Sequence, residues 1–93
     1  MSGNRSLIRI SSRRWLGCDP SGRGIAVAFG EGDGLWQVKL EDDPNEYLDS
    51  DLRTVIAEAT DSDAGDPWIV ELADEIEHEL NHAEGRRGGH RQA

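Results

Sequence analysis

Two stretches of alternating side chains around a glycine-rich connection constrain the fold of this chain more than any other feature. In residues 25–29 larger side chains alternate with alanine. In residues 35–40 the larger apolar side chains occupy every second position: Trp36, Val38 and Leu40. Alternation with a period of two on both sides of such a connection predicts a β-hairpin. We expect the face that carries the three apolar side chains to turn toward the rest of the domain.

The pattern becomes helical after Pro44. Ser50 can cap a helix over residues 51–60, and Asp66 followed by Pro67 is a strong start for a second helix over residues 67–84, which Gly85 closes. Apolar residues recur at helical spacing in both segments: Leu52, Val55, Ile56 and Ala59 in the first, and Ile69, Leu72, Ala73, Ile76, Leu80 and Ala83 in the second. We expect Leu72, Ile76 and Leu80 to pack against Leu52, Val55 and Ile56 as an antiparallel pair.

Together these elements predict one α+β domain, in which a small antiparallel sheet of two or three strands is packed by the C-terminal helical hairpin. Residues 1–6 are expected to form a flexible arm, residues 7–84 the domain, and residues 85–93 a disordered tail. The segment from Leu7 to Trp15 favours an edge strand. The composition of residues 17–22 favours a turn or loop.

The apolar content of the chain indicates a thin core. Leu, Ile, Val and Phe account for 19 of the 93 residues, and three tryptophans add apolar area. No apolar run approaches the ~20 residues that a membrane span needs, and Arg9 interrupts the N-terminal apolar residues before they could form a signal peptide. Cys18 is the only cysteine, so no disulfide framework is expected. These features favour a cytoplasmic protein without a membrane anchor.

Charge is distributed unevenly along the chain. Residues 31–84 carry eighteen carboxylates against Lys39 and Arg53, a net charge of −16, whereas residues 1–30 carry +4 and residues 85–93 carry +3. An acidic centre repels nucleic-acid phosphates and attracts basic proteins. We therefore expect a non-enzymatic binding or inhibitor protein that engages a basic partner protein, in the manner of immunity proteins, antitoxins or nucleic-acid mimics. The alternative is that the acids serve solubility alone.

The expected partner-binding residues are the carboxylates of the last helix and those that precede the first helix. They are Glu71, Asp74, Glu75, Glu77 and Glu79, together with Asp42, Asp43 and Glu46. Clustered carboxylates accelerate the encounter with a basic partner, and an apolar anchor then sets how long the complex lasts. A further possibility is a subunit whose apolar face is completed by a neighbour, and the sequence leaves the oligomeric state open.

One string in the last helix is similar to the motif of the zincin metallopeptidases. It consists of His78 and His82, four residues apart, with Glu79 beside the first. The resemblance implies zinc ligation by the two histidines and a general-base role for Glu79. Gly88 stands where the longer family pattern has its third histidine. We interpret the string as a solvated helix face that holds no cofactor, and a zinc-dependent hydrolase is the alternative.

Overall fold

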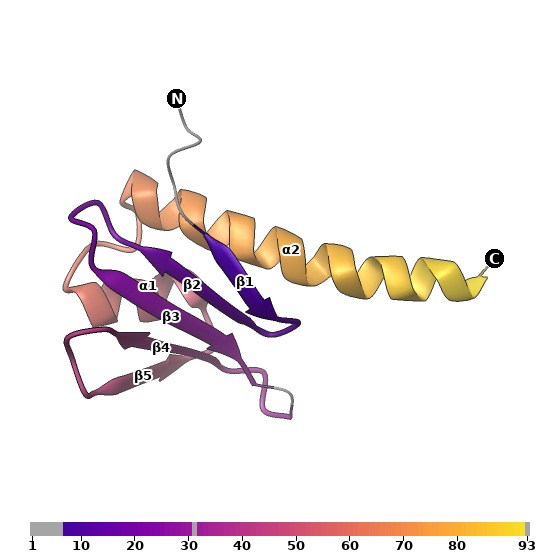
Figure 1. Cartoon of the computed structure of the whole chain (residues 1–93), viewed down its shortest axis with the longest axis horizontal. Coiled ribbons are helices and arrows are strands. Elements are labelled where there is room, and N and C mark those ends of the chain that lie inside the picture. The colour runs from indigo at the N-terminus through magenta and orange to yellow at the C-terminus, as the bar shows by residue number, and fades with distance from the viewer. Residues whose placement is uncertain (1–6, 31, 93) are drawn as a thin grey trace.

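The computed structural model describes residues 7–30 and 32–92, and the side chains of residues 83–92 lie outside that description. Five strands form one antiparallel sheet in the order of the chain: β1 (Ile8–Ser11), β2 (Arg14–Cys18), β3 (Gly24–Phe29), β4 (Trp36–Leu40) and β5 (Glu46–Asp49). Two helices, α1 (Leu52–Thr60) and α2 (Pro67–Gln92), lie on the same face of the sheet (Figure 1). No helix in the described part of the chain is long and apolar enough to cross a membrane.

The expected hairpin is confirmed as β3 and β4. Val27 lies opposite Val38, and Ile25 lies opposite Leu40. Trp36, Val38 and Leu40 are buried, whereas Lys39 is exposed and Gln37 is half-buried. The alternation therefore identified both the hairpin and the strand face that contacts the helices.

The N-terminal segment forms two strands, where a single edge strand ending at Trp15 was predicted. A register irregularity between Arg9 and Ser11 leads into a tight turn, and β2 then continues through Gly17 and Cys18. Gly17 lies within strand β2, and at this position the backbone approaches α2 closely. A side-chain carbon at this position would lie 3.3 Å from Cδ1 of Leu72, which explains why the residue is glycine. The glycine indicated close packing and not a turn.

The predicted sheet of two or three strands was also too small at the other edge, where β5 pairs with β4. Val38 lies opposite Tyr47, and the Tyr47 hydroxyl donates a hydrogen bond to Oδ2 of Asp43 over 3.1 Å. The strand is only four residues long. Its two apolar side chains are too few to produce a recognisable period-two pattern.

The helix starts differ from expectation by one residue in α1 and agree in α2. Asp51, not Ser50, caps α1, because its carboxylate accepts hydrogen bonds from the backbone and the hydroxyl of Thr54. Pro67 begins α2 as expected, but the helix continues to Gln92, past the predicted stop at Gly85, since glycine permits a helix to end without requiring it. The predicted arm, residues 1–6, and the side chains of the predicted tail lie outside the described residues.

One hydrophobic core fills the space between the sheet and the helices. The apolar stripe of α1 and that of α2 from Ile69 to Leu80 are buried in it as expected, and it also takes in Trp15 of β2; the side chain of Ala83 lies outside the described residues. Trp15 and Trp36 lie with ring centroids 6.0 Å apart. Within the described part of the chain, every buried side chain is apolar. Functional polar groups must therefore be sought on the helical surface, at the loops and on the open face of the sheet.

Candidate functional site

The two histidines of the zincin-like string lie on the outer surface of α2. His78 and His82 are exposed, and their rings stack with centroids 5.9 Å apart and an interplanar angle of 16°. Ile76 and Leu80 of the same helix are buried on the side that faces the sheet. The expected outward orientation of the histidines is therefore confirmed.

Glu79, the base of the implied motif, turns toward the sheet. Its Oε1 accepts a hydrogen bond from Nε1 of Trp15 over 2.9 Å, and Trp15 is fully buried. A buried indole N–H requires an acceptor, so Glu79 has a structural role. Nothing in the sequence pairs these residues, because they are 64 positions apart.

A third zinc ligand does not accompany the histidines in the described part of the chain, where no three His, Cys, Asp or Glu residues are grouped as a metal site. His90 is the remaining histidine in the last helix, and its side chain lies outside the described residues. A catalytic zinc site takes three protein ligands, of which these residues supply two.

The acidic residues of α2 lie in different surroundings. Asp74 accepts a hydrogen bond from Arg53 of α1 over 2.9 Å, and this bond raises the pKa of Arg53. Glu71 is exposed and Glu75 is half-buried. Burial raises the pKa of Glu77. The structure thus brings Glu71, Asp74 and Glu75 together on the outer surface of α2 and turns Glu79 away from it.

The three acids before α1 lie elsewhere. Asp42 forms an ion pair of 3.8 Å with Arg23, and Asp43 accepts hydrogen bonds from Tyr47 and from the backbone of Asn45. Glu46 is exposed on β5, on the same side as Lys39, away from the helices. The eight predicted residues therefore do not form one continuous surface.

A further acidic region lies at the C-terminal end of α1. A hollow of about 540 Å³ is lined there by Tyr47, Thr54, Ala57, Glu58, Asp61, Ser62 and Ala64. Glu58 and Asp61 are exposed. The C-terminal end of a helix dipole is negative, and the last turn of α1 contains no basic residue that would offset it. The dipole therefore adds to the negative potential of the Glu58 and Asp61 carboxylates. This end of the helical layer is suited to a cation.

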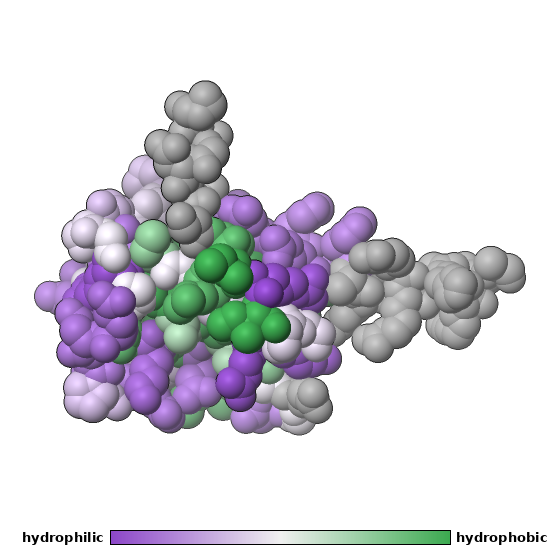
Figure 2. Space-filling view, in the orientation of Figure 1, coloured by the Kyte–Doolittle hydropathy of each residue, from purple (hydrophilic) through white to green (hydrophobic). Residues whose placement is uncertain are grey.

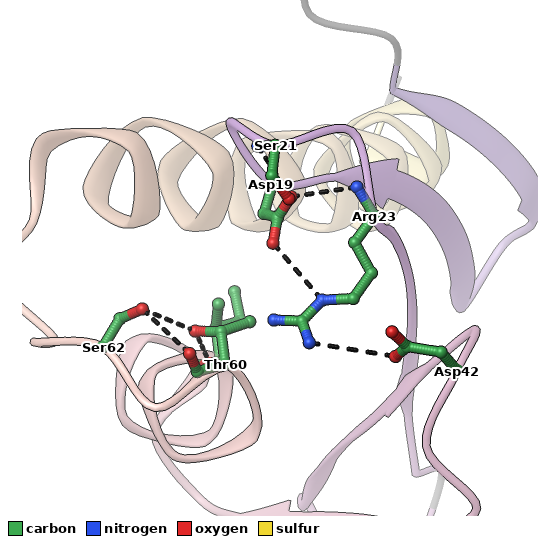
Figure 3. Close-up of polar contacts among 7 residues, drawn as sticks. Asp19, Ser21, Arg23, Asp42, Thr60 and Ser62 are labelled. Atoms are coloured by element: carbon green, nitrogen blue, oxygen red, sulfur yellow. Dashed lines mark hydrogen bonds and ion pairs between the residues drawn. The ribbon is translucent and has the colours of Figure 1, made fainter.

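A separate polar cluster fixes the turn between β2 and β3 (Figure 3). The carboxylate of Asp19 accepts hydrogen bonds from the backbone and the hydroxyl of Ser21 and from the backbone of Arg23. Nε of Arg23 lies 3.4 Å from the same carboxylate, but it is not oriented for a hydrogen bond. Burial acts to raise the pKa of Asp19, and the hydrogen bonds from Ser21 and Arg23 outweigh burial and hold the pKa below its usual value. These contacts give the cluster a structural role.

Asp19→Asn tests this cluster through its pH dependence. A lowered folded-state pKa stabilises the protein above the unfolded-state pKa of about 3.9, and this stability is lost as the pH falls through the folded-state value. We expect the variant to be less stable by about 1–2 kcal/mol at neutral pH, and the difference from wild type to shrink below about pH 4. Urea unfolding at several pH values measures it, with Glu46→Gln as the exposed control. A difference that stays constant with pH would contradict the assignment.

In comparisons with known proteins, no protein-family model, no curated protein and no solved structure matches this chain.

Proposed function

We propose that this protein is a small, acidic, non-enzymatic binding protein whose helical layer engages a basic partner protein. The charge of that layer carries the proposal. From Leu40 to His82 the only lysine or arginine is Arg53, and Arg53 is bound to Asp74. The carboxylates of Glu58, Asp61 and Glu71 are exposed on the two helices and at the end of α1. A surface of one sign accelerates association with an oppositely charged protein.

The hollow at the end of α1 is the proposed anchor point on this surface. A lysine or arginine of the partner would lie between Glu58 and Asp61, at the negative end of the helix dipole. The ring of Tyr47 lines the same hollow and offers an aromatic surface to the cation. The outer acids of α2 would then steer the approach, and the hollow would determine how slowly the partner leaves.

Charge reversal on the helical layer tests the proposal. The partner is first captured at low salt, and binding kinetics are then measured with Glu58→Lys combined with Glu71→Lys. We expect the association rate to fall by about tenfold, with a smaller change in dissociation, because long-range attraction acts mainly on encounter. Added salt should reduce the same rate in wild type.

The control applies the same change of charge away from the helices, as Asp33→Lys combined with Glu46→Lys. Both residues are exposed, and Glu46 lies on the open face of the sheet. We expect this variant to associate nearly as fast as wild type. If neither double variant alters the association rate, the carboxylates serve solubility and the proposal is wrong.

The alternative function is a zinc-dependent hydrolase, which the exposed and stacked histidines of α2 favour. The hydrogen bond that Glu79 accepts from Trp15 argues against a hydrolase, because a general base must reach the metal-bound water. We expect protein that has been mildly chelated to retain no stoichiometric zinc in elemental analysis. One tightly held zinc per chain, lost in His78→Ala, would reverse the ranking of the two functions.

A further inference from the structure

β5 is an edge strand whose outer side is unpaired in the part of the chain that the structure describes. It lies at one end of the strand order and pairs with β4 alone (Figure 1). The outer N–H and C=O groups of such a strand can pair with another chain. α1 packs against β5 on the helical side of the sheet. The unpaired edge therefore runs beside the helix that carries the acidic hollow.

The hollow at the end of α1 opens next to this edge. Tyr47 of β5 lines it together with Glu58 and Asp61. Because Tyr47 lies opposite the buried Val38, its side chain lies on the helical side of β5. The side chains of Glu58 and Asp61 form no hydrogen bond or ion pair with another described residue. Basic side chains on the helical side of a strand added beside β5 would meet these two carboxylates.

The open side of the same edge carries one exposed apolar side chain among polar ones. Figure 2 shows hydrophobic residues gathered over β1 and β2, whereas hydrophilic residues predominate over β4 and β5. Leu48 follows Tyr47 in the strand, so it lies on the open side, where it is 56% exposed. An apolar side chain of an added strand would pack against Leu48. The edge is thus suited to a strand in which basic and apolar residues alternate.

We propose that the basic partner contributes an extended segment that pairs with the outer edge of β5 as an additional strand. Its basic side chains enter the hollow between Glu58 and Asp61, and its alternate apolar side chains cover Leu48. In this mode of recognition, main-chain hydrogen bonds supply affinity and side-chain positions supply specificity. The inference rests on the proposed function, because it names the form in which the basic partner reaches the hollow.

The charges along β5 favour this partner over a second copy of the chain. β5 carries Glu46 and Asp49, so two β5 edges would repel each other, and charged edge strands resist self-association. The same carboxylates attract a basic strand. β1, at the opposite edge of the sheet, carries Arg9 and a register irregularity, and both features disfavour the pairing of a basic strand there.

Two short peptides of equal composition test the inference without the natural partner. In one peptide lysine and valine alternate, and in the other the lysines and the valines form separate blocks. We expect the alternating peptide to bind at least about tenfold more tightly in calorimetric titration at low salt, because only its sequence places every lysine on one side of a strand. Amide hydrogen exchange in the complex should become slower in β5 and stay unchanged in β1.

Removal of the two carboxylates tests the side-chain part of the inference. Glu58→Gln combined with Asp61→Asn should weaken binding of the alternating peptide by about five- to tenfold. Asp61 has a φ of 57°, and asparagine tolerates this left-handed conformation, so the variant should retain the turn. Asp33→Asn combined with Glu41→Gln removes the same charge at exposed positions outside the hollow, and it should leave the affinity nearly unchanged.

The outcomes distinguish this inference from the proposed function. Equal binding of the two peptides would overturn strand addition, as would binding of the alternating peptide without slower amide exchange in β5. Both results would leave a basic partner in place. An alternating peptide that does not bind at its highest soluble concentration would also overturn strand addition, whereas the proposed function is decided by the association kinetics of the captured partner.

Discussion

Truncation of Ile76 to alanine is expected to lower the free energy of unfolding by about 2–4 kcal/mol. Ile76 is fully buried and lies in the middle of the apolar stripe of α2, within the core that the sheet and both helices share. The truncation removes apolar contacts and leaves a cavity that a close-packed core fills only in part. In a domain of this size the loss is a large fraction of a total stability of roughly 5–10 kcal/mol.

Urea unfolding followed by tryptophan fluorescence measures this change. Asn81→Ala provides the control on the same helix, since Asn81 is exposed, and it should alter the free energy of unfolding by less than about 0.5 kcal/mol. An Ile76→Ala effect as small as that of the control would mean that α2 does not bury this side of the helix.

Replacement of Glu79 by alanine is expected to cost about 1–3 kcal/mol, because it removes the acceptor of the buried Trp15 indole N–H. Glu79→Gln keeps a carbonyl oxygen in a similar place and should recover most of that stability. The pair of variants therefore separates the hydrogen bond from the charge. The free energy of unfolding is again the measurement, with Glu46→Ala as the exposed control.

A double-mutant cycle with Trp15→Phe completes this test. Once the indole N–H is absent, Glu79→Ala should cost much less than it does in wild type, and the difference gives the coupling between the two side chains. A residue that served only as a catalytic base would show no such coupling. If Glu79→Gln is as unstable as Glu79→Ala, the carboxylate contributes through its charge and not through the bond to Trp15.

The elements predictable from the sequence were those that repeat their pattern over enough residues. In the hairpin of β3 and β4, larger and smaller or apolar and polar side chains alternate through two strands. The apolar stripes of α1 and α2 extend over several turns, so the buried face of each of these elements is visible as a regular spacing of apolar residues in the sequence. The four-residue strand β5 is too short to show a reliable period, and the segment predicted as one edge strand forms β1 and the beginning of β2. Gly17 was assigned to a turn because composition cannot distinguish a turn glycine from one that makes room for Leu72.

The candidate site was less predictable than the fold, because it depends on which carboxylates the fold uses for itself. Sequence shows that the centre of the chain is acidic. It does not show that Arg53 binds Asp74, that Arg23 approaches Asp42, or that the Trp15 indole donates a hydrogen bond to Glu79. Each of these contacts joins residues that are distant in sequence. The hollow beside Glu58 and Asp61 likewise exists only because α1 lies against β5.

The order of the strands has a consequence for how fast the chain finds this structure. Each strand pairs with its neighbour in the sequence, so the sheet can grow by successive closures of short loops, which carry a small entropic cost. Chains dominated by such near-neighbour pairings fold faster than those that must join distant strands. Rapid completion of the sheet shortens the time during which unpaired strand edges invite aggregation. Fast folding therefore limits aggregation in a protein whose β1 and β2 strands carry the exposed apolar side chains Ile8, Ile10 and Leu16.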